Sequence, residues 1–218
     1  MRTVAEKAAR PERASRDAAA SRAPASAAGG ARAGHEFARV QVHARGVMQR
    51  DPSFDSCSAA QQQQISATHA RAMEIVNNAF TQLTRPRLDP VVERALRLRF
   101  NSTDFLVQIN VGGVMADLRR EAHSPQYECQ SRQIGTRRGW SMWCVPFTDI
   151  ELYPDWFNDT DIDMRAKTLI HEWCHRYICL ADFGYLDRDP EAIRHGTIRA
   201  LYNADAYAYL AYDIRNVT

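Results

Sequence analysis

The sequence lacks the features that mark several classes of protein. No apolar run approaches the roughly 18 consecutive residues that cross a bilayer, so a transmembrane helix is excluded. The formal net charge is only +2, which argues against a strongly basic nucleic-acid binder. Five cysteines in 218 residues are too few for a disulfide-stapled miniprotein, and no two of them form a Cys-x-x-Cys metal pattern. What remains is a chain with enough apolar residues to build one globular core.

Lysine is almost missing from the chain. Of 28 basic residues only Lys7 and Lys167 are lysines, and the others are arginines. A GC-rich genome explains this composition simply, because it also favours the alanine that is abundant here. The alternative is a function in which the chain's own lysines are a liability.

Residues 1–46 differ in composition from the rest of the chain. Residues 1–34 are Ala, Arg, Ser, Pro and Gly with almost no large apolar side chain, which predicts a disordered extension. Polar and charged residues interrupt every alanine run, so the apolar stretch of a secretory signal peptide is lacking. Residues 34–46, GHEFARVQVHARG, resemble a segment near the N-termini of cargo proteins of bacterial extracellular contractile injection systems. That resemblance implies a contractile injection apparatus as partner, and a cytoplasmic protein that is exported as cargo without a signal peptide.

Hydrophobic periodicity from residue 47 to residue 218 predicts one α+β domain. The segment 58–83 places apolar side chains at steps of three, four and seven, which is one face of a long helix with Ser58 as its N-cap. Further helices are predicted at 91–100, 162–178 and 201–212, and strands at 104–113, 140–147 and 149–157.

The strongest functional signal is the motif His171-Glu172-x-x-His175 in the predicted helix 162–178. On an α-helix, residues four apart project from one face about one turn apart. Two imidazoles in that arrangement can each reach one Zn²⁺ at roughly 2.0–2.1 Å. Glu172 follows the first ligand and would point beside the metal, where its carboxylate can take a proton from water. The motif therefore predicts a zinc-dependent hydrolase.

A hydrolytic zinc site usually has three protein ligands, and the residues after the motif limit the choice of the third. Ile178 and Ala181 stand where a metzincin needs glycine and histidine. Glu191 is closer to the motif than the glutamate of a gluzincin, and it directly follows a proline. Asp182 comes seven residues after His175, where the helix can end.

The motif and two segments after it resemble one family of zinc peptidases. The segments are Asp182-Phe183-Gly184-Tyr185 and Asn203-Ala204-Asp205-Ala206-Tyr207, and the family is the aspzincins, which comprises deuterolysins and peptidyl-Lys metalloendopeptidases. The resemblance covers about residues 55–212. It implies a zincin-like metallopeptidase domain, in which the motif helix and a C-terminal helix accompany a small sheet.

The family resemblance also implies roles for individual residues. Asp182 would be the third zinc ligand beside the two histidines, Tyr185 would stabilise the oxyanion, and Asp205 would be a substrate-binding carboxylate of the primed-side pocket. A disulfide between Cys57 and Cys129 is implied as well.

Two departures from the family pattern bear on these roles. Cys179 and the two residues after it replace the usual Gly-Thr-x before the aspartate, which leaves Asp187 as a second candidate for the third ligand. Ala208 stands where lysine-specific members have a second acid, so strict lysine specificity is not implied.

Several of these residues have a second interpretation. For Asp205, a structural role or a role in holding a zinc ligand in place fits the sequence as well as substrate binding does. Cys174 and Cys179 flank the ligand face and are predicted to be buried free thiols rather than ligands. His195 is a further candidate ligand, and His69 is predicted to be a partly buried helix histidine.

The sequence thus predicts a zinc-dependent endopeptidase with Zn²⁺ as cofactor and a protein or peptide as substrate. The substrate is expected to lie extended along an edge strand in residues 149–154. A preference for lysine on the primed side would give the lysine scarcity a meaning, because Lys7 and Lys167 would be the only lysine sites for self-cleavage. Export would make the enzyme a bacterial effector or toxin. A catalytically inactive zincin-fold binding protein is the alternative.

Overall fold

The fold is taken from a computed structural model that describes residues 51–145, 148–184 and 196–218. The predicted extension 1–46 with its export segment lies outside the described residues, as do Tyr185, Asp187 and His195. In chain order the elements are β1 (Ser53–Asp55), α1 (Ala59–Leu83), α2 (Pro90–Phe100), α3 (Phe105–Glu121), β2 (Gln126–Cys129), β3 (Gly139–Ser141), β4 (Ile150–Leu152), α4 (Pro154–Asn158), α5 (Ile162–Ile178), α6 (Thr197–Leu201) and α7 (Ala204–Asp213).

Helix α1 forms where the apolar periodicity predicts it. A capping box begins it, in which the Gln61 N–H donates to Ser58 Oγ and the Ser58 N–H donates to Gln61 Oε1 at 2.9 Å. The apolar stripe, including Ile65, Ala72 and Val76, is fully buried. The predicted helix and its N-cap are confirmed.

The prediction of a strand at residues 104–113 is wrong, because this segment is the first half of α3. Its buried side chains recur at steps of four, four and three, which is the period of a helix. Three further apolar residues face solvent at exposures of 54–78%, and they obscure this period in the sequence. The buried residues are Val107, Val111, Met115 and Leu118, and the exposed ones are Phe105, Leu106 and Ile109.

The small sheet has the strand order β1-β2-β4-β3, in which only β3 is antiparallel to its neighbour. The predicted strand at 149–157 is shorter than expected, since it ends at Leu152 and Pro154 starts α4. Strand β4 pairs with β2 on one side and β3 on the other, so residues 149–154 do not form the expected edge. Among the described strands, β3 is the edge next to the motif helix.

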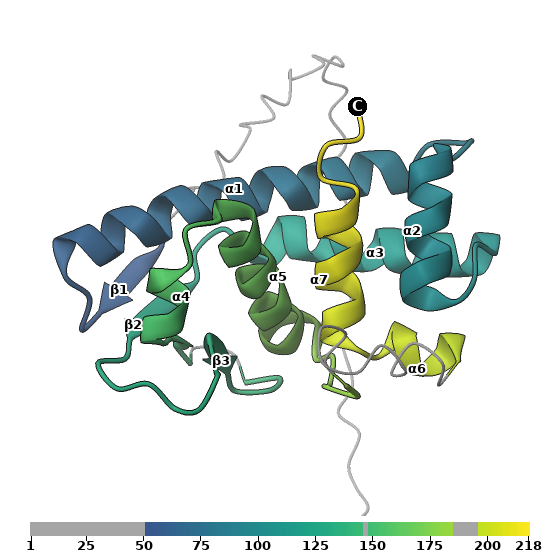
Figure 1. Ribbon diagram of the computed structural model, residues 1–218. Coiled ribbons are helices and arrows are strands. Elements are labelled where there is room, and N and C mark those ends of the chain that lie inside the picture. The colour runs from purple at the N-terminus through teal and green to yellow at the C-terminus, as the bar shows by residue number, and fades with distance from the viewer. Residues whose placement is uncertain (1–50, 146–147, 185–195) are drawn as a thin grey trace, which may run out of the picture. The chain divides into compact units, whose positions relative to one another are not determined.

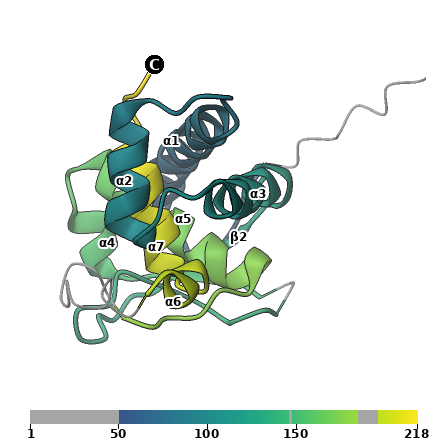
Figure 2. The same ribbon diagram turned by 90° about the vertical axis from the view of Figure 1, so that its right-hand side faces the viewer.

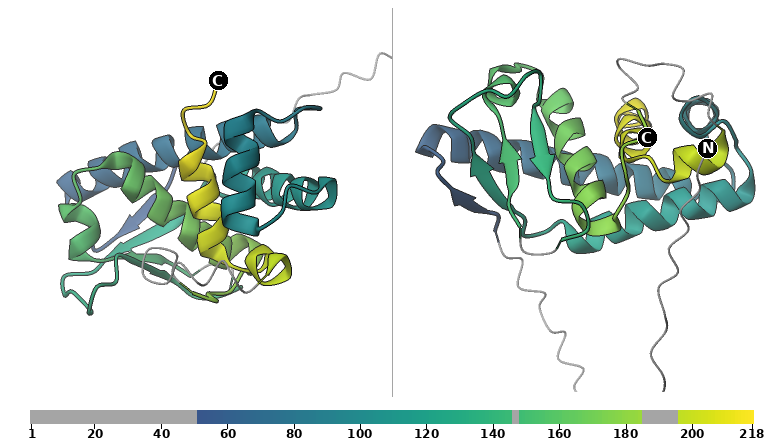
Figure 3. Two further views of the ribbon diagram at one scale, coloured as in Figure 1. Left: turned by 45° about the vertical axis from the view of Figure 1, so that its right-hand side comes forward. Right: turned by 90° about the horizontal axis from the view of Figure 1, so that it is seen from below.

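Helix α5, which carries the motif, occupies the centre of the helical layer. It contacts β3 on one side and α7 on the other, and it packs against α1 and α3 (Figures 1 and 3). Figure 2 looks along α1 and α3, which lie side by side. Trp173 of α5 and Tyr207 of α7 are completely buried in the shared core. The architecture confirms the α+β class, and none of the described helices has the length and apolarity needed to cross a membrane.

Two disulfides join segments that are distant in sequence. Cys57 and Cys129, the pair implied by the family resemblance, are bonded and tie the start of α1 to the end of β2. Cys144 and Cys179 form a second disulfide, so the prediction of a free thiol at Cys179 is wrong. Cys174 is free and buried as predicted, because its side of α5 faces the core.

Candidate metal centre

The two motif histidines lie on the face of α5 that borders a cleft. Asp161 begins the helix by accepting a hydrogen bond from the Asp163 N–H at 2.8 Å, and the predicted four-residue spacing places the two rings one turn apart. Each histidine is 8% exposed. The Nε2 atoms of His171 and His175 are 3.0 Å apart, so both rings aim at the same point.

The second nitrogen of each ring has an acceptor, which fixes how the ring is turned. His171 Nδ1 lies 3.1 Å from Asp205 Oδ1, and His175 Nδ1 lies 2.6 Å from the carbonyl oxygen of Leu180. Protonated Nδ1 atoms satisfy both acceptors and leave the two Nε2 lone pairs for a metal ion. Asp205 thus holds a candidate ligand in place, which is one of the two roles left open by the sequence.

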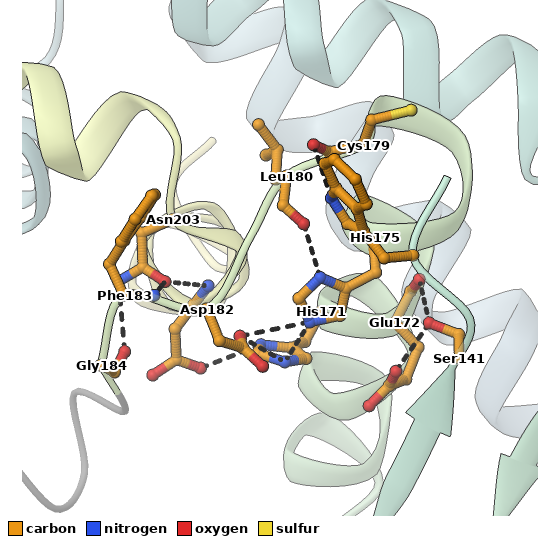
Figure 4. Close-up of polar contacts among 12 residues, drawn as sticks. Ser141, His171, Glu172, His175, Cys179, Leu180, Asp182, Phe183, Gly184 and Asn203 are labelled. Atoms are coloured by element: carbon orange, nitrogen blue, oxygen red, sulfur yellow. Dashed lines mark hydrogen bonds and ion pairs between the residues drawn. The ribbon is translucent and has the colours of Figure 1, made fainter. Parts of the chain in front are cut away.

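Asp182 completes a group of three possible metal donors. Its Oδ1 lies 3.4 Å from His171 Nε2 and 3.2 Å from His175 Nε2 (Figure 4). Donor atoms from the three residues all lie within 4.8 Å of one another. Two imidazole nitrogens and one carboxylate oxygen are a donor set that suits zinc and leaves a coordination position open.

The segment that carries Asp182 is held by the start of α7. Helix α5 ends at Ile178, and its C-cap Cys179 turns the chain away with a φ of 62°. Ala181 then pairs with Asn203 in an isolated β-bridge. The Asn203 amide donates to the carbonyl oxygen of Gly184 at 3.2 Å, and its side-chain oxygen caps α7. Asn203 and Asp205 therefore act on both sides of the candidate metal centre.

The charges around the two imidazoles favour a cation. Burial alone would lower the pKa of His171, but the hydrogen bond to Asp205 and the nearby Glu172 and Asp182 carboxylates outweigh burial and raise it to about 9. Burial also opposes a charge on His175, whose pKa is nevertheless raised, chiefly by Asp182. Three carboxylates thus surround a pair of nitrogens, and a divalent metal ion fits this negative environment.

Glu172 lies beside the donor group and is held by β3. The Ser141 hydroxyl lies 2.8 Å from Glu172 Oε2 and 3.0 Å from its backbone carbonyl oxygen. Burial raises the pKa of Glu172, although the two histidines and the Ser141 hydrogen bond act in the opposite direction. A Cβ atom at Gly139 would lie only 3.0 Å from Glu172, so glycine allows β3 to pass this close.

A cleft of about 700 Å³ lies over this group. The structure brings together on its wall five residues singled out by the sequence, and Tyr185 lies outside the described residues. These five are His171, Glu172, His175, Asp182 and Asp205.

Several residues of the site carry no signal in the sequence. Trp143 lines the cleft, and its Nε1 donates to the Cys179 carbonyl oxygen at 2.9 Å. The Cys144 N–H donates to the His175 carbonyl oxygen at 3.1 Å, and the second disulfide joins the same two segments. Five cysteines allowed this bridge, but sequence alone does not give disulfide connectivity. Ser141 and Gly139 reach Glu172 only through the position of β3, so nothing local marked them.

Comparison with known proteins identifies the fold. No protein-family model and no curated protein matches the sequence. Among solved structures, the chain is similar to a zinc peptidase from Grifola frondosa, with a TM-score of 0.60 and 20% sequence identity. The match covers 72% of this chain and 96% of that chain. The described domain therefore has the fold of a zinc peptidase.

Proposed function

We propose that the protein is a zinc-dependent endopeptidase. The observation that carries this proposal is the convergence of His171, His175 and Asp182 in an open cleft, with the buried carboxylate of Glu172 beside them. The fold shared with a zinc peptidase supports it. In this proposal the three converging residues hold the metal, and Glu172 does not.

The residues of the cleft have distinct parts in peptide hydrolysis. Zinc, when bound, supplies Lewis-acid chemistry and lowers the pKa of water toward about 7. Glu172 accepts the proton of the attacking water at its carboxylate and then delivers it to the leaving amine. The Ser141 hydroxyl holds that carboxylate in place, and burial brings its pKa closer to neutrality, where a general base is most effective. Tyr185 remains the proposed oxyanion donor.

An edge strand beside the candidate metal centre is available to bind the substrate. Strand β3 pairs only with β4 among the described strands, and Gly139, Trp140 and Ser141 line the cleft. A peptide that lies extended along β3 would form main-chain hydrogen bonds and pass across the metal centre. The family resemblance implies a preference for lysine on the primed side, and the side chains around Asp205 decide whether this protein shares it.

We propose that the enzyme acts after export, as a bacterial effector. Two disulfides suit an oxidising compartment rather than a reducing cytoplasm. The resemblance of residues 34–46 to injection-system cargo supports export through a contractile injection apparatus. Deletion of residues 34–46 should abolish loading into the contractile apparatus, which an immunoblot of purified particles would measure. Unchanged loading would refute this route.

The endopeptidase proposal is tested by digestion of a peptide library with the zinc-loaded protein and with Glu172→Gln. We expect Glu172→Gln to keep stoichiometric zinc and to lose roughly 10²–10⁴-fold in activity, because it removes the proton acceptor and no ligand. Zinc content measured by atomic absorption is the control. A wild-type protein that binds zinc and cleaves nothing would be an inactive zincin-fold binding protein.

A further inference from the structure

Lys167 is the single lysine in the described part of the chain, and it lies inside the cleft. It precedes His171 by one turn of α5, so Lys167, His171 and His175 form one stripe along the helix. Its side chain is 8% exposed and lines the same cavity as the metal donors. A buried ammonium in such a position has a direct influence on what the cleft accepts.

Helix α7 contacts this ammonium through the ring of Tyr209. The Lys167 Nζ lies 3.8 Å from the centroid of the Tyr209 ring. Tyr209 follows Asp205 by one turn of α7, just as His171 follows Lys167 by one turn of α5. The two helices thus face each other through two contacts, one between Lys167 and Tyr209 and one between His171 and Asp205. Stacking on an aromatic face stabilises the cation in this position.

Two arginines add further positive charge to the lining of the cleft. Arg137 and Arg138, just before β3, also line the cleft. Arg138 also binds Asp159 at 2.6 Å, so part of its charge is offset outside the cleft. Asp205, the carboxylate that α7 contributes to this lining, accepts a hydrogen bond from His171. The lining of the cleft, as far as the structure describes it, has three cationic side chains and three carboxylates, and all three carboxylates interact with His171.

We propose that Lys167 determines specificity, so that the cleft rejects lysine and arginine beside the scissile bond and accepts an acidic side chain there. The proposal rests on the endopeptidase function and replaces the lysine preference implied by the family resemblance. A substrate cation would be placed next to the largely buried Lys167 ammonium, where like charges repel more strongly than in bulk water. A substrate carboxylate would form an ion pair with the same ammonium.

Charge substitutions at Lys167 test this proposal. Library digestion first identifies the substrate position at which preference changes in Lys167→Met. Matched peptides with Glu, Gln or Lys at that position then give the ratio of kcat/KM for Glu over Lys. We expect a ratio of at least about 10 for the wild type, a loss of about tenfold in Lys167→Met, an inverted ratio in Lys167→Glu, and a retained ratio in Lys167→Arg.

Taking a ratio within each variant cancels differences in folding and zinc content. Arg176→Met is the matched control, because Arg176 is a buried cation of the same helix that does not line the cleft. Its ratio should equal that of the wild type. A wild-type preference for lysine, or the same ratio in Lys167→Met as in the wild type, would overturn the proposal.

A binding measurement separates failure of this proposal from failure of the endopeptidase function. Fluorescent forms of the matched peptides are titrated against zinc-loaded Glu172→Gln, with and without Lys167→Glu. Tighter binding of the Glu peptide that reverses with Lys167→Glu would support the charge preference even if the wild type cleaves nothing. Equal binding of the Glu and Lys peptides in both proteins would refute it.

Discussion

The two sides of the candidate metal centre are held in different ways. His171 and His175 lie on a long, capped and largely buried helix, and their separation follows from helix geometry alone. Asp182 lies on an irregular segment, and its side chain is 33% exposed. Asn203 and the disulfide at Cys179 position that segment. Local sequence therefore determines two donors, whereas contacts with distant segments determine the third.

The largest expected effect on zinc affinity comes from removing the third donor. Asp182→Ala should weaken zinc binding by more than about 100-fold, because loss of a ligand costs more than loss of an outer-shell partner. The fold should remain, since the side chain is partly exposed and lies outside the hydrophobic core. Competition with a chelating dye measures the affinity, with the exposed Asp155→Ala as control. Unchanged affinity would remove Asp182 from the site and favour Asp187.

Removing each disulfide in turn distinguishes an effect on stability from an effect on metal binding. They span 72 and 35 residues, so chain entropy gives a loss of roughly 4 kcal/mol for either one on Cys→Ala substitution. We expect both double variants to lose similar stability in urea. Only Cys144→Ala/Cys179→Ala should also weaken zinc binding, because that bridge holds the chain three residues before Asp182. Equal zinc affinities in the two variants would contradict this division.

Stability should decrease at acidic pH because of His69, which packs against the buried side of α5. Burial, with a smaller contribution from His123, lowers the pKa of His69 from 6.5 to about 4, and its ring packs against Trp173 of α5. Between these pH values the unfolded chain binds the proton and the folded protein does not. Stability should therefore fall by up to about 3 kcal/mol as the pH drops from 6.5 to 4.

Urea unfolding of the metal-free protein from about pH 7 to about pH 4 measures this loss. His69→Gln can still hydrogen-bond to Tyr127 and has no proton to take up, so its stability should fall less steeply over the same range. Parallel pH profiles for the wild type and the variant would show that His69 does not contribute.

The smallest expected effect concerns the hydrogen bond that orients His171. Asp205→Ala removes the acceptor for His171 Nδ1 and should weaken zinc binding by roughly 10–100-fold. Asp205→Asn keeps an acceptor oxygen and should recover part of that loss. If Asp205 only contacted the substrate, zinc affinity would stay unchanged in both variants. Dye competition therefore distinguishes the two roles of Asp205.

The success of sequence-based prediction follows the same division between local sequence and contacts with distant segments. Helices α1, α2, α5 and α7 were predictable because their apolar periods are clear and their caps are local. The strand predicted at 104–113 failed because exposed Phe105, Leu106 and Ile109 mask the helical period of α3.

In the site, the histidine pair and Glu172 follow from one local motif. Ser141 and the Cys144–Cys179 bridge do not, because they depend on where β3 and its following loop pack against α5. Their contacts with Glu172 and Cys179 join residues separated by 31 and 35 positions. No local pattern encodes such a pairing.

The contact between His171 and Asp205 has a consequence for the time at which the site forms. The two residues are 34 positions apart, and ribosomes add roughly 5–20 residues per second. The motif is complete at His175, 30 positions before Asp205, so a nascent chain carries it for about 1.5–6 seconds before Asp205 exists. During that interval His171 lacks its acceptor, and the Asp182 segment lacks Asn203. Ribosome-bound copies with a finished motif helix are consequently still without the two residues that position the candidate centre.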